Sequence, residues 1–160
     1  MKYIKRDEFN SNINEIFIKS NRLNDNWHLI ETDSPQNVKY LEKKEQFMFQ
    51  NDIVTFVYHI IYSESYEVPV FYLNAFKSTG AQLDYNSLNE YFKLDKSNAD
   101  LMVLSQQEHP ILFKPFYFLH PCKTSEWMSN LSYESNYTLK WFSFVAVTLN
   151  ISFDYLKYIQ

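Results

Sequence analysis

The sequence predicts an α+β protein in which helices flank an antiparallel β-meander. Three observations support this fold class: an amphipathic segment near the start, a series of β-branched and aromatic runs in the middle, and apolar residues at helical spacing near the end. The chain has 160 residues, a length that suits one compact core. No internal repeat, low-complexity tract or linker divides it, so we expect a single domain over residues 1–160.

The first half of the chain predicts one helix followed by short strands. The helix covers residues 6–20, where apolar side chains recur three or four positions apart opposite a polar face. Strands are predicted over residues 27–32 and 38–41, because each is rich in strand-forming residues and the turn-prone residues 33–35 separate them. These short strands would begin the sheet.

The middle of the predicted sheet is residues 53–62. This run is β-branched and aromatic almost throughout, as expected for a central strand covered on both faces. A turn at residues 63–65 leads to a strand over residues 68–75, with Pro69 near its start, where a missing N–H is tolerated. The two strands would form an antiparallel hairpin and continue the meander.

A short helix is predicted over Ser87–Lys93, with Ser87 as its N-cap and Glu90 as the capping-box partner. Two apolar segments follow, Leu101–Leu104 and Phe116–Leu119.

Two further helices complete the predicted fold. The first is capped by Thr124 or Ser125 and continues to Leu131. The second covers residues 137–149, whose apolar side chains lie three or four positions apart.

The composition excludes several classes of protein. Aromatic residues make up 19% of the chain, whereas Gly80 and Cys122 are its single glycine and single cysteine. So many rings need a core, and one cysteine closes no disulfide within the chain, which excludes disorder and a disulfide framework. Phosphate-binding loops, dinucleotide turns and nucleophile elbows need more glycine. A net charge of −4 offers no basic surface to nucleic acid.

The sequence also predicts the compartment. Its first residues lack the apolar stretch of a signal peptide, and no run of about eighteen apolar residues could span a bilayer. We therefore expect a cytoplasmic protein without a transmembrane segment, in which Cys122 stays a thiol.

The triplet His120-Pro121-Cys122 raises the question of thiol chemistry. A thiol protease needs an imidazole beside the sulfur, but residues two apart in an extended segment lie about 7 Å apart, and Pro121 keeps His120 extended. Such a protease would have to recruit another histidine: His28, His59 or His109. His120 and Cys122 alone do not make a zinc motif, so no metal and no cofactor are expected. A lone cysteine is most often an inert core thiol.

The residues around Cys122 favour a reactive thiol over an inert one. Residues 104–112 read Leu-Ser-Gln-Gln-Glu-His-Pro-Ile-Leu, and residues 115–126 read Pro-Phe-Tyr-Phe-Leu-His-Pro-Cys-Lys-Thr-Ser-Glu. This region resembles the autophagy-related protein ten family, which consists of conjugating enzymes for a ubiquitin-like modifier. The His-Pro-Cys triplet alone is weak evidence, but with Gln-Gln-Glu-His-Pro at this distance upstream it is highly specific. The resemblance is dense over residues 104–128 and thin elsewhere, although residues 141–143 and 149–150 also resemble the family's last helix.

The resemblance implies a transferase with a ubiquitin-conjugating-enzyme-like fold. In that scheme the activating enzyme, autophagy-related protein seven, passes the modifier, autophagy-related protein twelve, to Cys122 as a thioester. A lysine of the acceptor, autophagy-related protein five, then attacks the thioester. The resemblance also implies a cytoplasmic enzyme that can be recruited to the forming autophagosomal membrane.

Attack by the lysine is the harder step, because an amine of pKa about 10.4 is mostly protonated at neutral pH. Ordinary ubiquitin-conjugating enzymes carry a His-Pro-Asn triplet whose amide supports the site, and this chain has none. His120 is the nearest donor for the thioester oxyanion or for bracing the loop, and the hydroxyls of Tyr62 and Tyr66 are weaker candidates. We expect residues 108–110, Glu-His-Pro, to be architectural.

Two alternatives stay open. The autophagy-related protein three family shares the His-Pro-Cys triplet and conjugates a related modifier to phosphatidylethanolamine, but its chains are longer and contain a flexible insertion. The other alternative is a non-catalytic interaction module with a buried cysteine. One departure is also evident: the family commonly has glycine where this chain has Phe113, so we expect a differently built turn there.

Overall fold

The computed structural model describes residues 2–94, 104–131 and 136–160. Its elements, in chain order, are α1 (Arg6–Leu23), β1 (His28–Glu31), β2 (Lys39–Phe49), β3 (Asp52–Ser63), β4 (Val68–Phe76), α2 (Tyr85–Phe92), β5 (Leu104–Glu108), β6 (Pro115–Leu119), the 3₁₀-helix η2 (Pro121–Lys123), α3 (Thr124–Ser129), α4 (Tyr137–Thr148) and α5 (Tyr155–Ile159).

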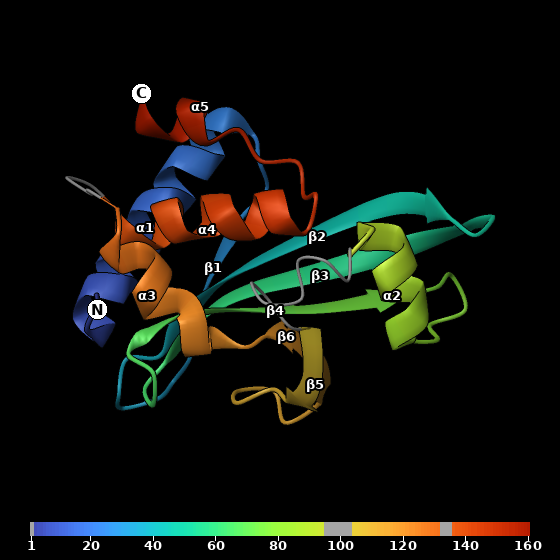
Figure 1. The fold of residues 1–160 in the computed structure, drawn as a ribbon, viewed down its shortest axis with the longest axis horizontal. Coiled ribbons are helices and arrows are strands. Elements are labelled where there is room, and N and C mark those ends of the chain that lie inside the picture. Colours follow the sequence, from blue (N-terminus) through green and yellow to red (C-terminus); the bar gives the residue numbers. More distant parts are fainter. Residues whose placement is uncertain (1, 95–103, 132–135) are drawn as a thin grey trace.

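The strands form one six-stranded antiparallel sheet in the order β1-β2-β3-β4-β6-β5 (Figure 1). Strands β1 to β4 make the predicted meander, and the β5–β6 hairpin adds two strands beside β4. Strand β3 pairs along nearly its whole length with both β2 and β4. The α+β class and the central position of residues 53–62 are therefore confirmed.

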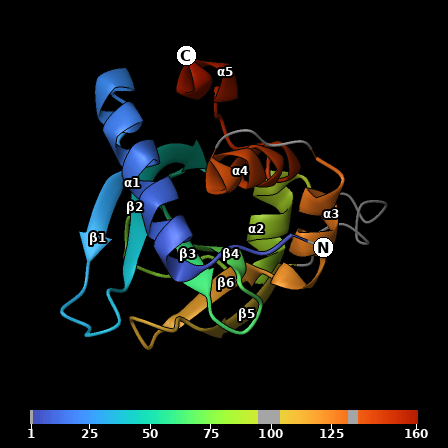
Figure 2. The ribbon, with the colours of Figure 1, turned by 90° about the vertical axis from the view of Figure 1, so that its left-hand side faces the viewer.

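Successive side chains of β3 point to opposite faces of the sheet. Phe56, Tyr58 and Ile60 belong to the main core, on the side of the sheet that helices α1 and α4 cover (Figure 2). Phe56 packs on Tyr91 and Phe92 in α2. Ile61 belongs to a smaller apolar cluster on the other side. The members of that second cluster are Tyr40, Ile61, Val70, Tyr72, Phe116 and Phe118, with Ile30 and Ile111 packed against it. Because both faces are buried, β3 carries apolar residues without the alternation of a half-exposed strand.

A buried chain of polar side chains crosses this second face. His109 is fully buried, and its Nδ1 accepts hydrogen bonds from the backbone N–H groups of Ile111 (3.1 Å) and Leu112 (3.0 Å). Its proton therefore lies on Nε2, which donates to Nδ1 of His59 at 2.9 Å. Nε2 of His59 in turn donates to Oε2 of Glu42 at 2.8 Å. The expected architectural role of the Glu-His-Pro segment is confirmed for His109, which ties the β5–β6 turn to β3 and β2.

The turn between β5 and β6 is built on a strained residue. The N–H of Phe113 donates to the carbonyl of His109 at 3.0 Å, and the N–H of His109 donates to the carbonyl of Lys114 at 2.7 Å. Phe113 has φ +54°, in the left-handed region that glycine adopts without steric cost. The backbone thus has the conformation that suits glycine, with phenylalanine in that place, and the expectation that this turn is built differently from the family's stays a prediction.

Two predicted helix starts need correction. The N-cap of α2 is Asp84, not Ser87, and the Asp84 carboxylate accepts a hydrogen bond from the Ser87 N–H at 2.8 Å. Helix α3 begins after Lys123 and has no side-chain cap, so Thr124 and Ser125 lie inside it, and it ends at Ser129 before Leu131. Both errors arise because several neighbouring residues can cap a helix, and tertiary packing selects one.

The strands also differ from their predicted extents. Strand β2 continues past residue 41 to Phe49 through charged residues, because a two-residue turn at Gln50 and Asn51, both with positive φ, holds it against β3. Of the predicted Leu101–Leu104 segment, residues 101–103 lie outside the described residues, and Leu104 begins β5. Helix α5 was not predicted.

The histidine chain makes stability depend on pH. Burial lowers the pKa of His109 to about 4, and burial also lowers the pKa of His59 despite the neighbouring Glu42 carboxylate. Below pH 6.5 the unfolded chain thus binds more protons than the folded protein, so stability falls as the pH falls. From pH 7 to about pH 5, urea unfolding should show a loss of about 1–3 kcal/mol, since each histidine contributes at most about 1.4 kcal/mol per pH unit.

A matched variant separates this effect from general titration. His28 is exposed on β1 and lies outside this hydrogen-bonded chain, so His28→Gln should retain the fall in stability. A flat stability between pH 7 and 5 in the wild-type protein would contradict the neutral, hydrogen-bonded state of His59 and His109.

The strained turn gives a second prediction. Phe113→Gly should stabilise the protein by about 0.5–1 kcal/mol, because it removes left-handed strain at a residue that is 72% exposed. Phe113→Ala is the control, since alanine retains the Cβ atom and the strain. The midpoint of urea unfolding measures both, and equal midpoints for the two variants would count against strain at this residue.

Candidate active site

Cys122 lies at the surface, immediately beyond the last strand of the sheet. Strand β6 ends at Leu119, His120 continues in extended conformation (φ −63°, ψ 127°), and Pro121 begins the 3₁₀-helix η2. The fixed φ of proline suits the first position of a helix, where a missing N–H costs nothing. This local sequence therefore places the exposed thiol of Cys122 on a short, rigid turn that leads directly into α3.

The ring of His120 is held beside Cys122. Its Nδ1 accepts a hydrogen bond from the backbone N–H of Cys122 at 3.2 Å, so the neutral imidazole carries its proton on Nε2. The ring meets Tyr66 edge-on at a centroid distance of 5.5 Å and lies 5.8 Å from the ring of Phe118. His120 thus has one nitrogen bound to the cysteine's backbone and the other available as a donor.

Beside Cys122 lies a hollow of about 360 Å³, here called the cysteine hollow. Besides Cys122, its lining residues are Tyr3, Ser65, Tyr66, Glu67, Pro121 and Ser125. They come from the N-terminal segment, the turn between β3 and β4, the 3₁₀-helix η2 and the start of α3. The cysteine hollow is therefore assembled from parts of the chain that are far apart in sequence.

The N-terminal segment joins those parts. The backbone N–H of Ile4 donates to the carbonyl of Glu67 in the β3–β4 turn at 2.9 Å. The backbone N–H of Lys2 donates to the carbonyl of Ser125 in α3 at 3.2 Å. The residues before α1 thus bind the turn on one side and α3 on the other. Sequence reasoning missed this segment, because four residues carry no periodic pattern.

The structure separates the two tyrosine candidates. Tyr66 is 41% exposed and lines the cysteine hollow with Cys122. Tyr62 is buried, and its hydroxyl donates to the carbonyl of Ile4 at 2.9 Å. Its ring packs on Phe9. Of the residues singled out from the sequence, the structure gathers Cys122, His120 and Tyr66 at one place, and Tyr62 braces the segment behind them.

The charges around the thiol are few and exposed. Lys123 and Glu126 lie 3.8 Å apart across the first turn of α3, so they largely offset each other. Glu67 adds one carboxylate to the cysteine hollow. Within the described ranges, no three His, Cys, Asp or Glu side chains converge as metal ligands. An exposed thiol on a rigid turn beside a hydrogen-bond donor suits a nucleophile that accepts and releases a large acyl group.

Residues 5–155 match the family model described as "Autophagocytosis associated protein, active-site domain". The chain belongs to this family. A six-stranded sheet with flanking helices is consistent with the ubiquitin-conjugating-enzyme-like fold that the sequence resemblance implied.

Proteins from human, Dictyostelium discoideum and Arabidopsis thaliana are similar to this chain. A human protein named "Ubiquitin-like-conjugating enzyme ATG10" is 36% identical over 120 residues, which cover 67% of this chain and 54% of the human one. Proteins of the same name are 37% identical in Dictyostelium discoideum, over 66% of this chain and 55% of the relative, and 30% identical in Arabidopsis thaliana, over 64% and 52%. The chain spans about half the length of these curated relatives.

A helix that crosses a bilayer must be long and predominantly apolar. Of the helices in the part of the chain that the structure describes, none combines the length and apolar character that crossing a bilayer requires.

Proposed function

We propose that this protein is a ubiquitin-like conjugating enzyme of autophagy, with Cys122 as its covalent carrier. The modifier is autophagy-related protein twelve, delivered by the activating enzyme, protein seven, and the acceptor is a lysine of protein five. The observation that carries the proposal is the exposed position of the chain's single cysteine, on a rigid turn beside a hollow, in a member of an active-site-domain family. We place the enzyme in the cytoplasm, with recruitment to the forming autophagosomal membrane.

Loading is an exchange between two thioesters. The sulfur of Cys122 attacks the modifier's terminal carbonyl carbon, a new C–S bond forms, and the bond to the activating enzyme's cysteine breaks. The proton of the Cys122 thiol ends on the released thiol, so atoms and charge balance. Because the bonds made and broken are alike, this step needs an accessible thiol more than strong activation, and Cys122 is exposed.

Transfer to the acceptor begins with the neutral amine of the lysine, forms a C–N bond and breaks the C–S bond, and the proton that the amine loses ends on the released Cys122 sulfur. Negative charge develops on the carbonyl oxygen during this attack, and a fixed donor aimed at it lowers the barrier. His120 can supply that donor through Nε2–H, because its Nδ1 is already bound by the Cys122 N–H. The hydroxyl of Tyr66 borders the same hollow and is the second candidate. Tyr62 supports the site indirectly, since its hydroxyl is bound to Ile4.

The first test of this function is a thioester assay. Incubation with protein seven, protein twelve and ATP should give an adduct on a non-reducing gel that disappears with thiol treatment. Cys122→Ser should give a more stable oxyester, and Cys122→Ala should give no adduct. A thiol-sensitive adduct on Cys122→Ala, or no adduct on the wild-type protein, would sink the proposal.

A thiol reagent distinguishes the conjugating enzyme from the alternative, a non-catalytic module with a buried cysteine. The exposed Cys122 should react promptly in the native protein, with one thiol per chain. A slow reaction limited by unfolding would favour the module. Transfer of a modifier to phosphatidylethanolamine vesicles rather than to protein five would favour the lipid-conjugating alternative.

A second test concerns the discharge step. His120→Ala should slow the discharge of the loaded thioester to protein five by about 100-fold, as expected for loss of one oxyanion donor, while loading remains close to normal. His28→Ala is the matched control, because His28 is exposed on β1 and does not line the cysteine hollow. A pulse-chase gel measures both variants. Equal discharge by His120→Ala and the wild-type protein would remove His120 from the chemistry.

A further inference from the structure

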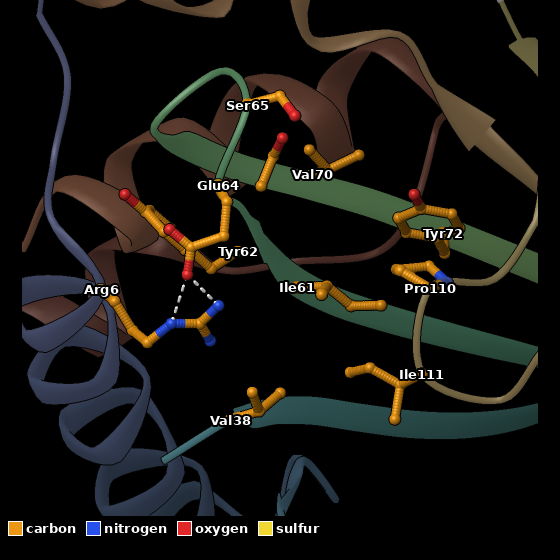
Figure 3. Close-up of a pocket in the computed structure, with 11 residues that line it drawn as sticks. Arg6, Val38, Ile61, Tyr62, Glu64, Ser65, Val70, Tyr72, Pro110 and Ile111 are labelled. Carbon is orange, nitrogen blue, oxygen red and sulfur yellow. Dashed lines mark hydrogen bonds and ion pairs between the residues drawn. The ribbon is translucent and has the colours of Figure 1, made fainter. Parts of the chain in front are cut away.

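The turn between β3 and β4 carries two acidic residues, Glu64 and Glu67, which have different surroundings. Glu64 forms an ion pair with Arg6 of α1, and this pair lies at one end of an apolar hollow of about 310 Å³ on the second face of the sheet (Figure 3). Ile61 and Ile111 line that apolar hollow. Glu67 instead lines the cysteine hollow, and among the described residues its carboxylate has no ion-pair partner.

The backbone of Glu67 is fixed at the rim of the cysteine hollow. Glu67 has φ +51°, in the left-handed region that costs energy for a residue with a Cβ atom. Its carbonyl accepts the hydrogen bond from the N–H of Ile4 at 2.9 Å, and the next residue, Val68, is buried at the start of β4. Strained residues of this kind persist where the surrounding contacts hold them, and they cluster at functional sites. The N-terminal segment and β4 therefore hold Glu67 at the hollow that contains the thiol.

Glu67 also sets the charge of the cysteine hollow. It is the one charged side chain among the described residues that line it, and the others are Tyr3, Ser65, Tyr66, Pro121, Cys122 and Ser125. The positive charge of Lys123 lies outside this lining and is offset by Glu126 at 3.8 Å. Aromatic rings such as those of the two lining tyrosines attract an ammonium group as well. A cation that approaches the thiol thus meets one uncompensated negative charge.

We propose that the carboxylate of Glu67 binds the ε-amine of the acceptor's lysine in the cysteine hollow and holds its nitrogen beside the thioester on Cys122. The proposal deepens the function proposed above and rests on it. At neutral pH a lysine amine, of pKa about 10.4, arrives as a cation, and removing a cation from water is costly without a partner. The carboxylate offsets this cost and keeps the amine in place until it loses a proton and attacks. Bonds and protons then change as in the transfer step described above, and Glu67 remains a carboxylate throughout.

Loading of Cys122 has no such requirement. The activating enzyme presents an uncharged thioester carbonyl, and the attacking sulfur is already part of the site. No cation has to enter the cysteine hollow during this step. Loss of the charge of Glu67 should therefore slow discharge to an amine without slowing loading.

The test compares two nucleophiles on the Glu67→Gln protein. The loaded thioester is chased either with Nα-acetyl-L-lysine amide, whose one amine is cationic at neutral pH, or with hydroxylamine, which is mostly uncharged. Loss of one charge-assisted hydrogen bond should lower the second-order rate constant for the lysine amide by about tenfold. The rate constant for hydroxylamine and the rate of loading should match those of the wild-type protein. Non-reducing gels measure all three, and thermal unfolding checks the fold.

Glu64→Gln is the matched control, because it removes one negative charge from the same turn but from a residue that does not line the cysteine hollow. It should discharge to both nucleophiles at the wild-type rates. An equal loss in Glu64→Gln and Glu67→Gln would indicate a general effect of charge. Equal losses for the two nucleophiles in Glu67→Gln would indicate a damaged site. Either result would overturn the role of Glu67.

Failure of the Glu67 proposal differs visibly from failure of the proposed function. If the wild-type protein forms no adduct on Cys122, the conjugating activity fails, and the role of Glu67 with it. If the adduct forms normally and Glu67→Gln discharges to the lysine amide as fast as the wild-type protein, only the Glu67 proposal fails.

Discussion

Burial of both faces of β3 governs the arrangement of the rest of the chain. A strand with apolar residues on both sides needs a cover on each, and here helices α1 and α4 provide one cover while the β5–β6 turn provides part of the other. Pairing on both edges places β2 and β4 beside it, and β6 then pairs with β4. The end of β6 carries Cys122 to the rim of the sheet, next to the turn at the end of β3. The position of the thiol is thus a consequence of how the central strand is buried.

The second face of the sheet buries both hydrogen-bonded polar side chains and apolar side chains. His59 and His109 could not be buried there as charged groups, so each is neutral. Each donates one ring N–H to the next acceptor, and the last acceptor is the carboxylate of Glu42. This chain fixes the turn that carries Ile111, and Ile111 forms part of the apolar hollow beside it. A hydrogen-bonded network that looks purely structural therefore also sets the shape of a surface hollow on this face of the sheet.

Sequence reasoning located the central strand and Cys122, because each has a strong local signal: a long β-branched and aromatic run, and a dense family resemblance around one cysteine. It failed where the deciding interaction is remote in sequence. The charged half of β2 has no strand pattern of its own and is held by pairing with β3. Ser65, Glu67 and the N-terminal segment reach the cysteine hollow only through tertiary contacts.

The N-terminal segment affects how the site unfolds and refolds. Its hydrogen bonds to Glu67 and Ser125 close very long loops. Such contacts form late in folding, because the entropy cost of closing the loop must first be offset by other contacts. The same segment is also fixed by burial of the Ile4 side chain in the main core. Detachment of residues 2–4 would dismantle the wall of the cysteine hollow and also remove Ile4 from the main core, so the integrity of the site and the packing of the core depend on the same short segment.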